Sequence, residues 1–393
     1  MSEKVVLMFL ANDFYTDPRV KQEAMSLIKA GFKVHVLAWD REGKFESLNL
    51  RDKLFVKNLK FLSGKSFGKI RYALAALLLQ VYEVFYGIKL IRKYGKIIIH
   101  ANDFNTLLGA YVLKSLFLKN VKLVYDSHEL TPAVYEEWYS PILGEMTYAL
   151  ERKFVEKVDW IITISPPVER YFKLISDKPV TVIYNFPLRK IVPKADKIKI
   201  RSLLNLPREK TIVSFVGMLR EDLALMELIQ AAKILKEKGF NDKIYFVIVG
   251  YGPSKEKIWD YVKENKLENI VTLIPRVPRE KALMYVKAAD YSYVIFNVLG
   301  YNSLIGMPWK LFESFACETR VIVKDGTYAA GFVKKNNLGI VIRDVSPENL
   351  AKIFEELVEK NMSPMDSNWK SFTWEAQEMR LLEVYNRLLE GLK

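Results

Sequence analysis

Short apolar runs alternate with amphipathic stretches along the chain, and this alternation limits the fold more than any other feature. The runs lie at 5–10, 34–38, 97–100, 121–125, 160–164 and 180–184, and then at 212–216, 244–249, 271–274, 291–296, 320–323 and 340–342. They are rich in Val and Ile and apolar on both alternations, as in strands buried on both faces. Helical patterns such as 20–30 and 225–238 separate them. The sequence therefore predicts an α/β fold with two doubly wound parallel-sheet domains.

The boundary between the two series is marked by a change in composition. Residues 189–210 break the strand–helix pattern with two prolines and carry eight Lys or Arg against two acids. We expect a first domain at 1–188, a linker at 189–208 and a second domain at 209–373. The final helix, 374–393, is expected to return to the first domain.

Composition excludes several classes of protein. The 393 residues are 27% charged and 50% hydrophobic, which excludes a disordered chain and a polytopic membrane protein. The single cysteine, Cys317, excludes a disulfide framework and a cysteine-built zinc site. The chain starts with a short apolar strand and no cleavable apolar segment, which indicates a cytoplasmic protein.

The charge balance indicates an anionic partner. Lys and Arg outnumber Asp and Glu by 60 to 46, for a net charge of +14. Phosphate groups and an anionic membrane surface both fit this excess. The chain has no recognised nucleic-acid motif and no glycine-aromatic RNA signature, so no nucleic-acid partner is predicted.

The residues that follow the predicted strands differ between the two halves. Ligands of open parallel sheets bind outside the carboxyl ends of the strands. In the first half those ends carry acids and histidines: Asp13, His100, Asp103, Asp126 and His128. In the second half they carry glycines and arginines: Gly217, Arg220, Gly250, Gly252 and Arg276. Such edges suit a nucleotide diphosphate on the second domain and a hydroxyl-bearing substrate on the first.

Several motifs, in their order and spacing, resemble those of one family. They are DPRV at 17–20, LVYDSHEL at 123–130, ITISPPVERYF, VIYNFP, FVGML, VIVGYGP, MPWKLFESFA and the closing WEAQEMRLLEVYNRLL. Together they resemble a GT-B glycosyltransferase of family 4 (group 1). The resemblance implies two Rossmann-like domains facing across a cleft, an acceptor-side domain first and a nucleotide-sugar domain second. It also implies transfer from a UDP- or GDP-sugar to a hydroxyl of a glycan or lipid-linked glycan, with retention and without a metal or other cofactor.

The segment around 308–313 is the main candidate for nucleotide binding. A helix N-terminus offers free N–H groups to an anion, and Lys310 adds a positive charge for a diphosphate. Glu313 can accept two hydroxyl donors, and the resemblance implies that these are ribose hydroxyls. The alternative is a capped surface helix with ordinary charges. Many relatives carry another glutamate eight positions earlier, where this chain has Ile305.

The Gly217 loop departs from the family pattern. Relatives usually carry basic residues near the positions of Met218 and Leu223 that grip the diphosphate, whereas this chain has only Arg220 between them. We expect Arg220 to supply the phosphate charge, with Arg276 as a further candidate. Gly250 and Gly252 would allow the backbone to approach the nucleotide, although two glycines also make an ordinary turn.

His128 and Asp103 are the candidates for chemistry on the first domain. By resemblance His128 contacts the donor sugar, and Asp103 is expected to orient the acceptor hydroxyl. The alternative for His128 is a partly buried histidine that caps the next helix, and the alternative for Asp103 is an N-cap of the helix at 104–116. His100, Asp103, Asp126 and His128 have ligand types that fit a metal, but no compact metal spacing, so no metal is predicted.

A basic stretch and an apolar run follow one another between residues 41 and 96. Residues 41–71 hold nine Lys or Arg against three acids, and the uncharged run 72–82 comes next. Eleven residues are too few to span a bilayer, which needs about 20. Two interpretations remain open: a helix that lies on an anionic membrane at the cytoplasmic face, and a long helix packed on the sheet.

Other functions remain open at this stage. The chain could be a different GT-B enzyme, such as a nucleotide-sugar epimerase or a phosphorylase, although no pyridoxal lysine is identified. It could also be a non-catalytic binding subunit, which the departures at Leu223 and Ile305 favour.

Overall fold

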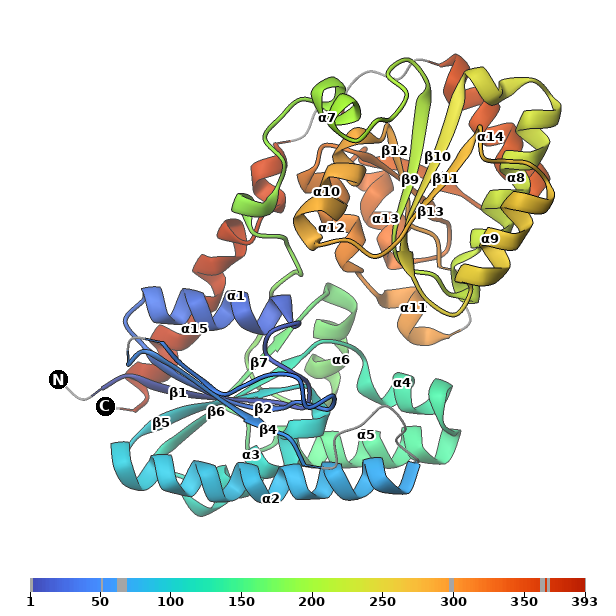
Figure 1. Cartoon of the computed structure of the whole chain (residues 1–393). Coiled ribbons are helices and arrows are strands. Elements are labelled where there is room, and N and C mark those ends of the chain that lie inside the picture. Colours follow the sequence, from blue (N-terminus) through green and yellow to red (C-terminus); the bar gives the residue numbers. More distant parts are fainter. Residues whose placement is uncertain are drawn as a thin grey trace. The chain divides into compact units, whose positions relative to one another are not determined.

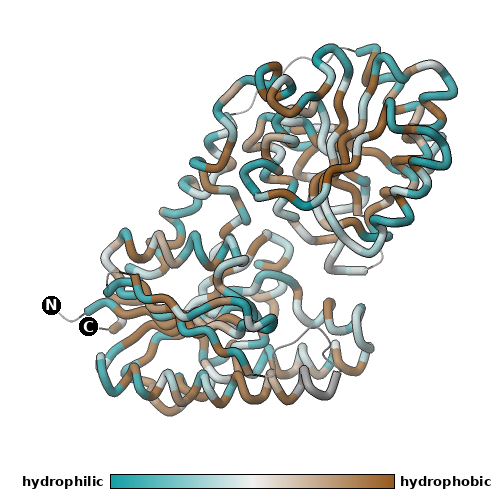
Figure 2. The backbone as a smooth tube through the Cα atoms, in the orientation of Figure 1, coloured by the Kyte–Doolittle hydropathy of each residue, from teal (hydrophilic) through white to brown (hydrophobic). Residues whose placement is uncertain are grey.

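The computed structural model describes residues 3–50, 52–61, 69–296, 300–360, 365 and 368–392. The chain divides into two compact units, Met1–Tyr184 with Gln377–Lys393, and Asn185–Ala376. Each unit is an α/β sheet covered by helices (Figure 1), and the strands through the middle of each unit are its most hydrophobic segments (Figure 2).

The first unit is built on a sheet whose described strands run in the order β3-β4-β2-β1-β5-β6-β7-β8. The strands are β1 (Val5–Leu10), β2 (Lys33–Trp39), β3 (Leu48–Leu50), β4 (Leu54–Leu59), β5 (Ile97–Asn102), β6 (Val121–Ser127), β7 (Trp160–Thr163) and β8 (Val180–Val182). The helices are α1 (Pro18–Lys29), α2 (Lys69–Tyr94), η1 (Phe104–Thr106), α3 (Leu107–Leu116), α4 (Thr131–Trp138), α5 (Pro141–Val155), α6 (Pro166–Ile175) and α15 (Glu375–Glu390). All pairings are parallel except β3 with β4.

The second unit repeats this arrangement with the order β11-β10-β9-β12-β13-β14. Its described strands are β9 (Thr211–Met218), β10 (Ile244–Tyr251), β11 (Val271–Ile274), β12 (Tyr291–Tyr293), β13 (Arg320–Lys324) and β14 (Gly339–Ile342). Its main helices are α7 (Lys197–Leu203), α8 (Leu225–Glu237), α9 (Lys255–Glu264), α10 (Arg279–Ala288), α11 (Tyr301–Ile305), α12 (Trp309–Ala316), α13 (Tyr328–Lys335) and α14 (Pro347–Glu359). Short 3-10 turns are η2 (Arg189–Ile191), η3 (Glu221–Leu223), η4 (Phe240–Asp242) and η5 (Trp369–Phe372).

The strand order confirms the predicted doubly wound architecture. In both units the chain reverses its direction of winding next to the first strand: between β1 and β5, and between β9 and β12. Ligands of such sheets bind at this reversal, outside the carboxyl ends of the strands. Asp103 directly follows β5, and Gly217 is the second-to-last residue of β9. Both are therefore placed where the fold binds ligands.

Two segments differ from their sequence-based description. The basic stretch 41–71 contains the strands β3 and β4, and β4 joins the buried sheet through Leu54 and Val56. Residues 189–208, described from sequence as a linker, form η2 and α7 within the second unit, where Ile200 and Leu206 join a buried apolar cluster. Local composition misses this packing because α7 is rich in basic residues, and composition does not show that Arg201 is buried and paired with Asp290.

Candidate active site

The carboxyl edge of the first sheet brings Asp103, Asp126 and His128 together. The ring of His128 lies between two carboxylates: Nε2 is 3.0 Å from Asp126 Oδ2, and Nδ1 is 3.2 Å from Asp103 Oδ2. The backbone N–H of His128 also donates to Asp103 Oδ1 at 3.1 Å. Burial disfavours the imidazolium, but the two carboxylates outweigh it and raise the pKa of His128 well above its usual value. The two carboxylates therefore favour the protonated form of His128, and both of its ring nitrogens are engaged.

Asp103 is the exposed member of this group. Its side chain is 34% exposed, against 17% for His128 and none for Asp126. Asp103 precedes η1 with a φ of 64°, but its side chain makes no capping hydrogen bond. The N-cap alternative is therefore wrong for its side chain, which faces His128 instead. A ligand hydroxyl arriving from solvent meets the Asp103 carboxylate before it reaches the imidazolium.

Arg19 neutralises Asp126 from the inner side. Its Nε and Nη2 donate to the two oxygens of Asp126 at 2.8 Å each, and its Nη1 donates to the carbonyl of Ile183 at 2.9 Å. Although burial favours a neutral acid, Arg19 and then His128 hold the pKa of Asp126 well below its usual value. Asp17 positions this arginine by capping α1, since its side chain accepts from the N–H of Val20 at 3.1 Å.

Three buried groups lie close enough to share a metal ion: Glu23, His100 and Asp126 have ligand atoms within 4.8 Å of one another. Arg19 already balances their charge, because its Nε also lies 3.2 Å from Glu23 Oε1. Burial raises the pKa of Glu23 well above its usual value, and burial lowers the pKa of His100. His100 Nδ1 is 2.5 Å from the hydroxyl of Tyr385 on α15. The three groups therefore form a buried cluster that Arg19 and Tyr385 contact.

In the second unit, Lys310 and Gly217 lie together at the carboxyl end of β9. The Lys310 ammonium is 4.4 Å from the ring centroid of Phe215 and 5.3 Å from that of Phe296. A Cβ on Gly217 would lie 3.4 Å from Nζ. Burial, with Arg220 nearby, lowers the pKa of Lys310 to about 8. Among the described residues no carboxylate forms an ion pair with this ammonium, so its charge is available to an anion.

Arg220, the predicted phosphate ligand, is paired with an acid of its own loop. Its Nε donates to Asp222 Oδ1 at 2.9 Å, and its Nη2 contacts Asp222 Oδ2. The side chains are 39% and 29% exposed. A diphosphate gripped by Arg220 would have to compete with Asp222. Leu223, where relatives carry a basic residue, is 2% exposed and belongs to the hydrophobic core.

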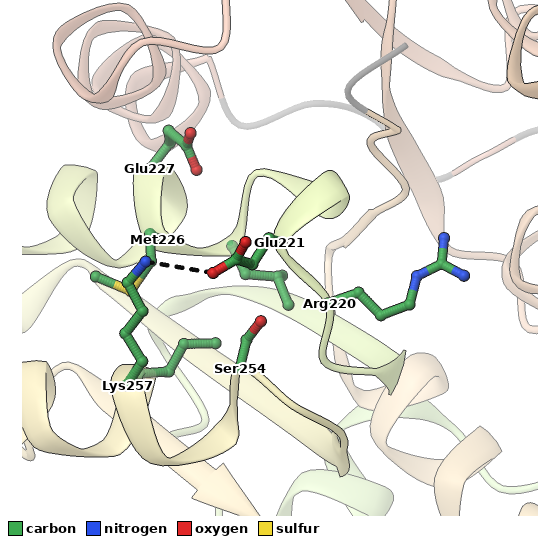
Figure 3. A pocket seen from close by; sticks show the side chains of 8 residues that line it. Arg220, Glu221, Met226, Glu227, Ser254 and Lys257 are labelled. Carbon is green, nitrogen blue, oxygen red and sulfur yellow. Dashed lines mark ion pairs between the residues drawn. The ribbon is translucent and has the colours of Figure 1, made fainter. Parts of the chain in front are cut away.

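A pocket of about 200 Å³ lies beside this loop (Figure 3). Glu221 and Lys257 form an ion pair across it at 3.6 Å. The guanidinium of Arg220 points away from the other labelled side chains of this pocket (Figure 3). Arg220 therefore lines the pocket without directing its charge into it.

Glu313, on α12, is held by an arginine of α10. Arg279 Nε donates to Glu313 Oε1 at 2.9 Å, and the guanidinium also lies 4.8 Å from the ring centroid of Trp309. The side chain of Glu313 is 15% exposed. No described residue hydrogen bonds the second oxygen, Oε2, so one acceptor of a fixed carboxylate is open to a ligand.

Gly250, near the end of β10, and Gly252, just after it, have a structural reason to be glycine. A Cβ on Gly250 would lie 1.8 Å from the carbonyl oxygen of Gly217, and one on Gly252 would lie 2.4 Å from that of Leu219. Between them, Tyr251 stacks under the guanidinium of the exposed Arg276, with 4.8 Å from centroid to Cζ. An apolar pocket of about 180 Å³ opens beside Gly250; it is lined by Leu219, Ile248, Gly250, Lys255, Glu256, Trp259, Leu273, Ile274 and Pro275.

Two family models match the chain one after the other. Residues 19–186 match Glycosyltransferase Family 4, and residues 196–373 match Glycosyl transferases group 1. The chain belongs to the group 1 glycosyltransferases. An uncharacterized glycosyltransferase of Methanocaldococcus jannaschii is 25% identical over 299 residues, covering 72% of this chain and 73% of that protein.

Solved structures show that this glycosyltransferase has the GT-B fold. Sucrose-phosphate synthase from Thermosynechococcus elongatus matches with a TM-score of 0.78 and 18% identity, over 99% of this chain and all of that one. HepE of Anabaena, in a complex with UDP, matches with a TM-score of 0.67 and 14% identity, over 99% of each chain. The predicted GT-B class and the group 1 family are therefore confirmed.

Sequence reasoning missed four charged residues of this glycosyltransferase: Arg19, Glu23, Asp222 and Arg279. A signal existed for the first two. Val20, Ala24 and Leu27 form the apolar side of α1, and Arg19 and Glu23 are four residues apart next to that side. Charges on a buried helix face require a partner. For Asp222 and Arg279 no comparable pattern exists, because their pairing depends on loop and helix geometry.

Proposed function

We propose that this glycosyltransferase is a retaining, metal-independent hexosyltransferase. In this proposal it transfers a sugar from a UDP- or GDP-sugar to a hydroxyl of a glycan or lipid-linked glycan, in the cytoplasm. The observation that carries the donor assignment is the Lys310 ammonium, which has no ion-pair partner among the described residues and lies beside the Gly217 loop. A partly buried cation without a counter-ion is costly unless an anion binds there.

The second unit would bind the nucleotide part of the donor. Lys310 faces the diphosphate, and a dianion nearby raises the pKa of the ammonium again, which keeps it charged at neutral pH. The open Oε2 of Glu313 suits a ribose hydroxyl, because Arg279 fixes the carboxylate through its other oxygen. The apolar pocket beside Gly250 is suited to a flat base.

The reaction breaks the bond between the sugar C1 and the leaving phosphate oxygen. The acceptor oxygen bonds to C1 on the same face, and its proton passes to the leaving diphosphate. Negative charge grows on that diphosphate as the bond breaks, so a fixed cation such as Lys310 stabilises the transition state more than the ground state.

The first unit would handle the sugar and the acceptor. Asp103 is exposed enough to accept a hydrogen bond from the attacking hydroxyl, and His128 fixes its orientation from behind. Because both ring nitrogens of His128 face carboxylates, the imidazolium would reach the sugar only if Asp103 turned toward the acceptor. Arg19 and His128 already compensate the charge of Asp126, which supports chemistry without a metal.

A ligand screen followed by a transfer assay tests the proposal. A nucleoside diphosphate at 100 times its Kd should stabilise the protein by about 2.7 kcal/mol, which a thermal shift detects. Lys310→Ala should reduce both the shift and turnover, whereas Lys334→Ala, on the exposed side of α13, should change neither. NMR of the product should show the anomeric configuration of the donor. Nucleotide binding without turnover of any UDP- or GDP-sugar would instead support the non-catalytic binding subunit.

A further inference from the structure

The outward side of α2 carries large apolar side chains where a helix on a sheet normally carries polar ones. They recur at intervals of three and four residues and so form one stripe along the helix, called here the outer stripe. Its members and their exposed fractions are Leu74 53%, Leu77 60%, Leu78 41%, Val81 43%, Tyr82 43% and Phe85 70%. A contiguous exposed apolar surface of this kind marks an interaction site.

The inner side of α2 is already buried in the first unit. Ala75, Leu79, Leu90 and Ile91 are at most 4% exposed. Segment Leu74–Tyr94 has the length and hydropathy to cross a membrane, so the eleven-residue run counted from sequence underestimated the apolar length of this helix. A third of its most apolar stretch is nevertheless buried inside the unit. Crossing a bilayer would expose the inner side to lipid and remove its packing partners. A position in the plane of a membrane surface keeps both sides satisfied.

Beyond Phe85 the outward side of α2 becomes basic. Lys89, Arg92 and Lys93 are exposed there. The helix has one acid, Glu83, and its side chain is fully buried. The outer stripe is thus followed by positive charge that no acid of the same helix offsets. This combination fits lipid headgroups that carry negative charge.

The α4–α5 hairpin carries further exposed apolar side chains beside α2. Its most exposed large side chains are Trp138 71%, Ile142 69% and Met146 54%. Gln80 of α2 and Tyr135 of α4 both hydrogen bond Asn105, so the hairpin lies next to the half of α2 that bears the outer stripe. Helices α2, α3 and α5 cover the same side of the first sheet (Figure 1). The exposed acids of the hairpin are Glu136, Glu137 and Glu145, so it can add apolar contact while α2 supplies the attraction to anions.

We propose that the outer stripe and the α4–α5 hairpin dock this protein on an anionic lipid membrane, with α2 parallel to the surface. A single apolar anchor gives only weak, reversible membrane binding, and a neighbouring basic segment provides the second signal. Here both signals lie on one helix. The occupant is lipid because, along α2, the exposed apolar side chains are followed by exposed cations and the one acid of the helix, Glu83, is buried.

Co-sedimentation of the full chain with vesicles tests the proposal. Vesicles of phosphatidylcholine alone are compared with vesicles that also contain phosphatidylglycerol, over a range of salt concentrations. The charge variant is Arg92→Gln with Lys93→Gln, and its matched control is Lys334→Gln with Lys335→Gln on exposed positions of α13. The apolar variant is Leu77→Ser with Phe85→Ser, and its control is Leu174→Ser, because Leu174 on α6 is 86% exposed.

We expect the wild type to bind the anionic vesicles and to be released by salt. Each basic side chain near such a surface contributes about fivefold in partitioning, so the charge variant should bind about 25-fold more weakly. The apolar variant should lose binding to anionic vesicles, and both controls should bind like the wild type. Equal binding to neutral and anionic vesicles, or binding that the two α2 variants do not reduce, would overturn the proposal. So would absence of binding together with a dimer that the apolar variant dissociates, since the surface would then pair with a second copy.

Discussion

Removal of the Asp222 carboxylate should strengthen the binding of a nucleoside diphosphate. In the unliganded protein Asp222 holds the Arg220 guanidinium through both of its oxygens. Both side chains are about a third exposed, and such pairs contribute about 0.2–1 kcal/mol. A phosphate that binds Arg220 must first offset this interaction. In Asp222→Asn the affinity for UDP, or for whichever diphosphate stabilises the wild type most, should therefore rise by up to about fivefold.

The complementary variant removes the cation itself. A hydrogen bond to a charged group contributes about 1.5–3 kcal/mol, so Arg220→Ala should weaken diphosphate binding by about 10- to 150-fold. Titration calorimetry measures both variants with the nucleoside diphosphate and with the nucleoside alone. The nucleoside carries no phosphate, so neither change should alter its affinity.

A matched control distinguishes the effect of removing a carboxylate beside Arg220 from the effect of removing one elsewhere in the same unit. Glu355 pairs with Lys238 at 2.6 Å in the same unit, away from the Gly217 loop, and Glu355→Gln should leave diphosphate affinity unchanged. Unchanged affinity in both Asp222→Asn and Arg220→Ala would refute the reasoning. Arg220 would then only stabilise its own loop through Asp222, and Lys310 would be the cation to test next.

Three further outcomes are expected. Glu313→Gln should weaken binding of a nucleoside diphosphate at least tenfold, because a neutral amide oxygen accepts a ribose hydroxyl less strongly, while a 2′,3′-dideoxy analogue should lose little. His128→Asn should cost most stability below about pH 6.5 and progressively less as pH rises through the raised pKa of the wild-type histidine, as urea unfolding at several pH values would measure. Gly250→Ala should unfold at lower urea than the wild type because its Cβ would meet a backbone carbonyl at 1.8 Å, whereas Gly331→Ala, with open space and a helical position, should raise stability by about 0.5–1 kcal/mol.

Most of the fold could be predicted from sequence because strands buried on both faces appear in the sequence as continuous apolar runs. All twelve predicted runs overlap strands of the two sheets. Boundaries were less accurate: the run at 291–296 contains β12, which ends at Tyr293. The missed strands, β3 and β4, lie at one edge of the first sheet, where β4 (LFVKNL) interrupts its apolar residues with Lys57 and Asn58 and β3 is mostly exposed. A strand that needs only one apolar face is hard to distinguish from a polar loop.

The site was less predictable, since a motif identifies a residue but not its partner. Resemblance identified His128, Glu313 and Arg220 as candidates, and strand ends identified Asp103. Their pairing depends on distances that sequence separation does not encode: Arg19 meets Asp126 across 107 residues, and Arg279 meets Glu313 across 34. These contacts change what each candidate is free to do. Asp222 pairs with Arg220, whereas Lys310 has no ion-pair partner among the described residues.

The chain leaves the first unit at Tyr184 and re-enters it at Gln377, so the whole second unit is inserted into the first. A ribosome that adds 5–20 residues per second needs about 10–40 s to make the 192 residues between them (Asn185 to Ala376). During that time the nascent first unit lacks α15, whose Tyr385 contacts Phe32 and the buried His100. The inserted unit has all its strands before α15 emerges. We therefore expect the earlier-synthesised unit to complete its folding last, and chaperones to engage it at the face that α15 later covers.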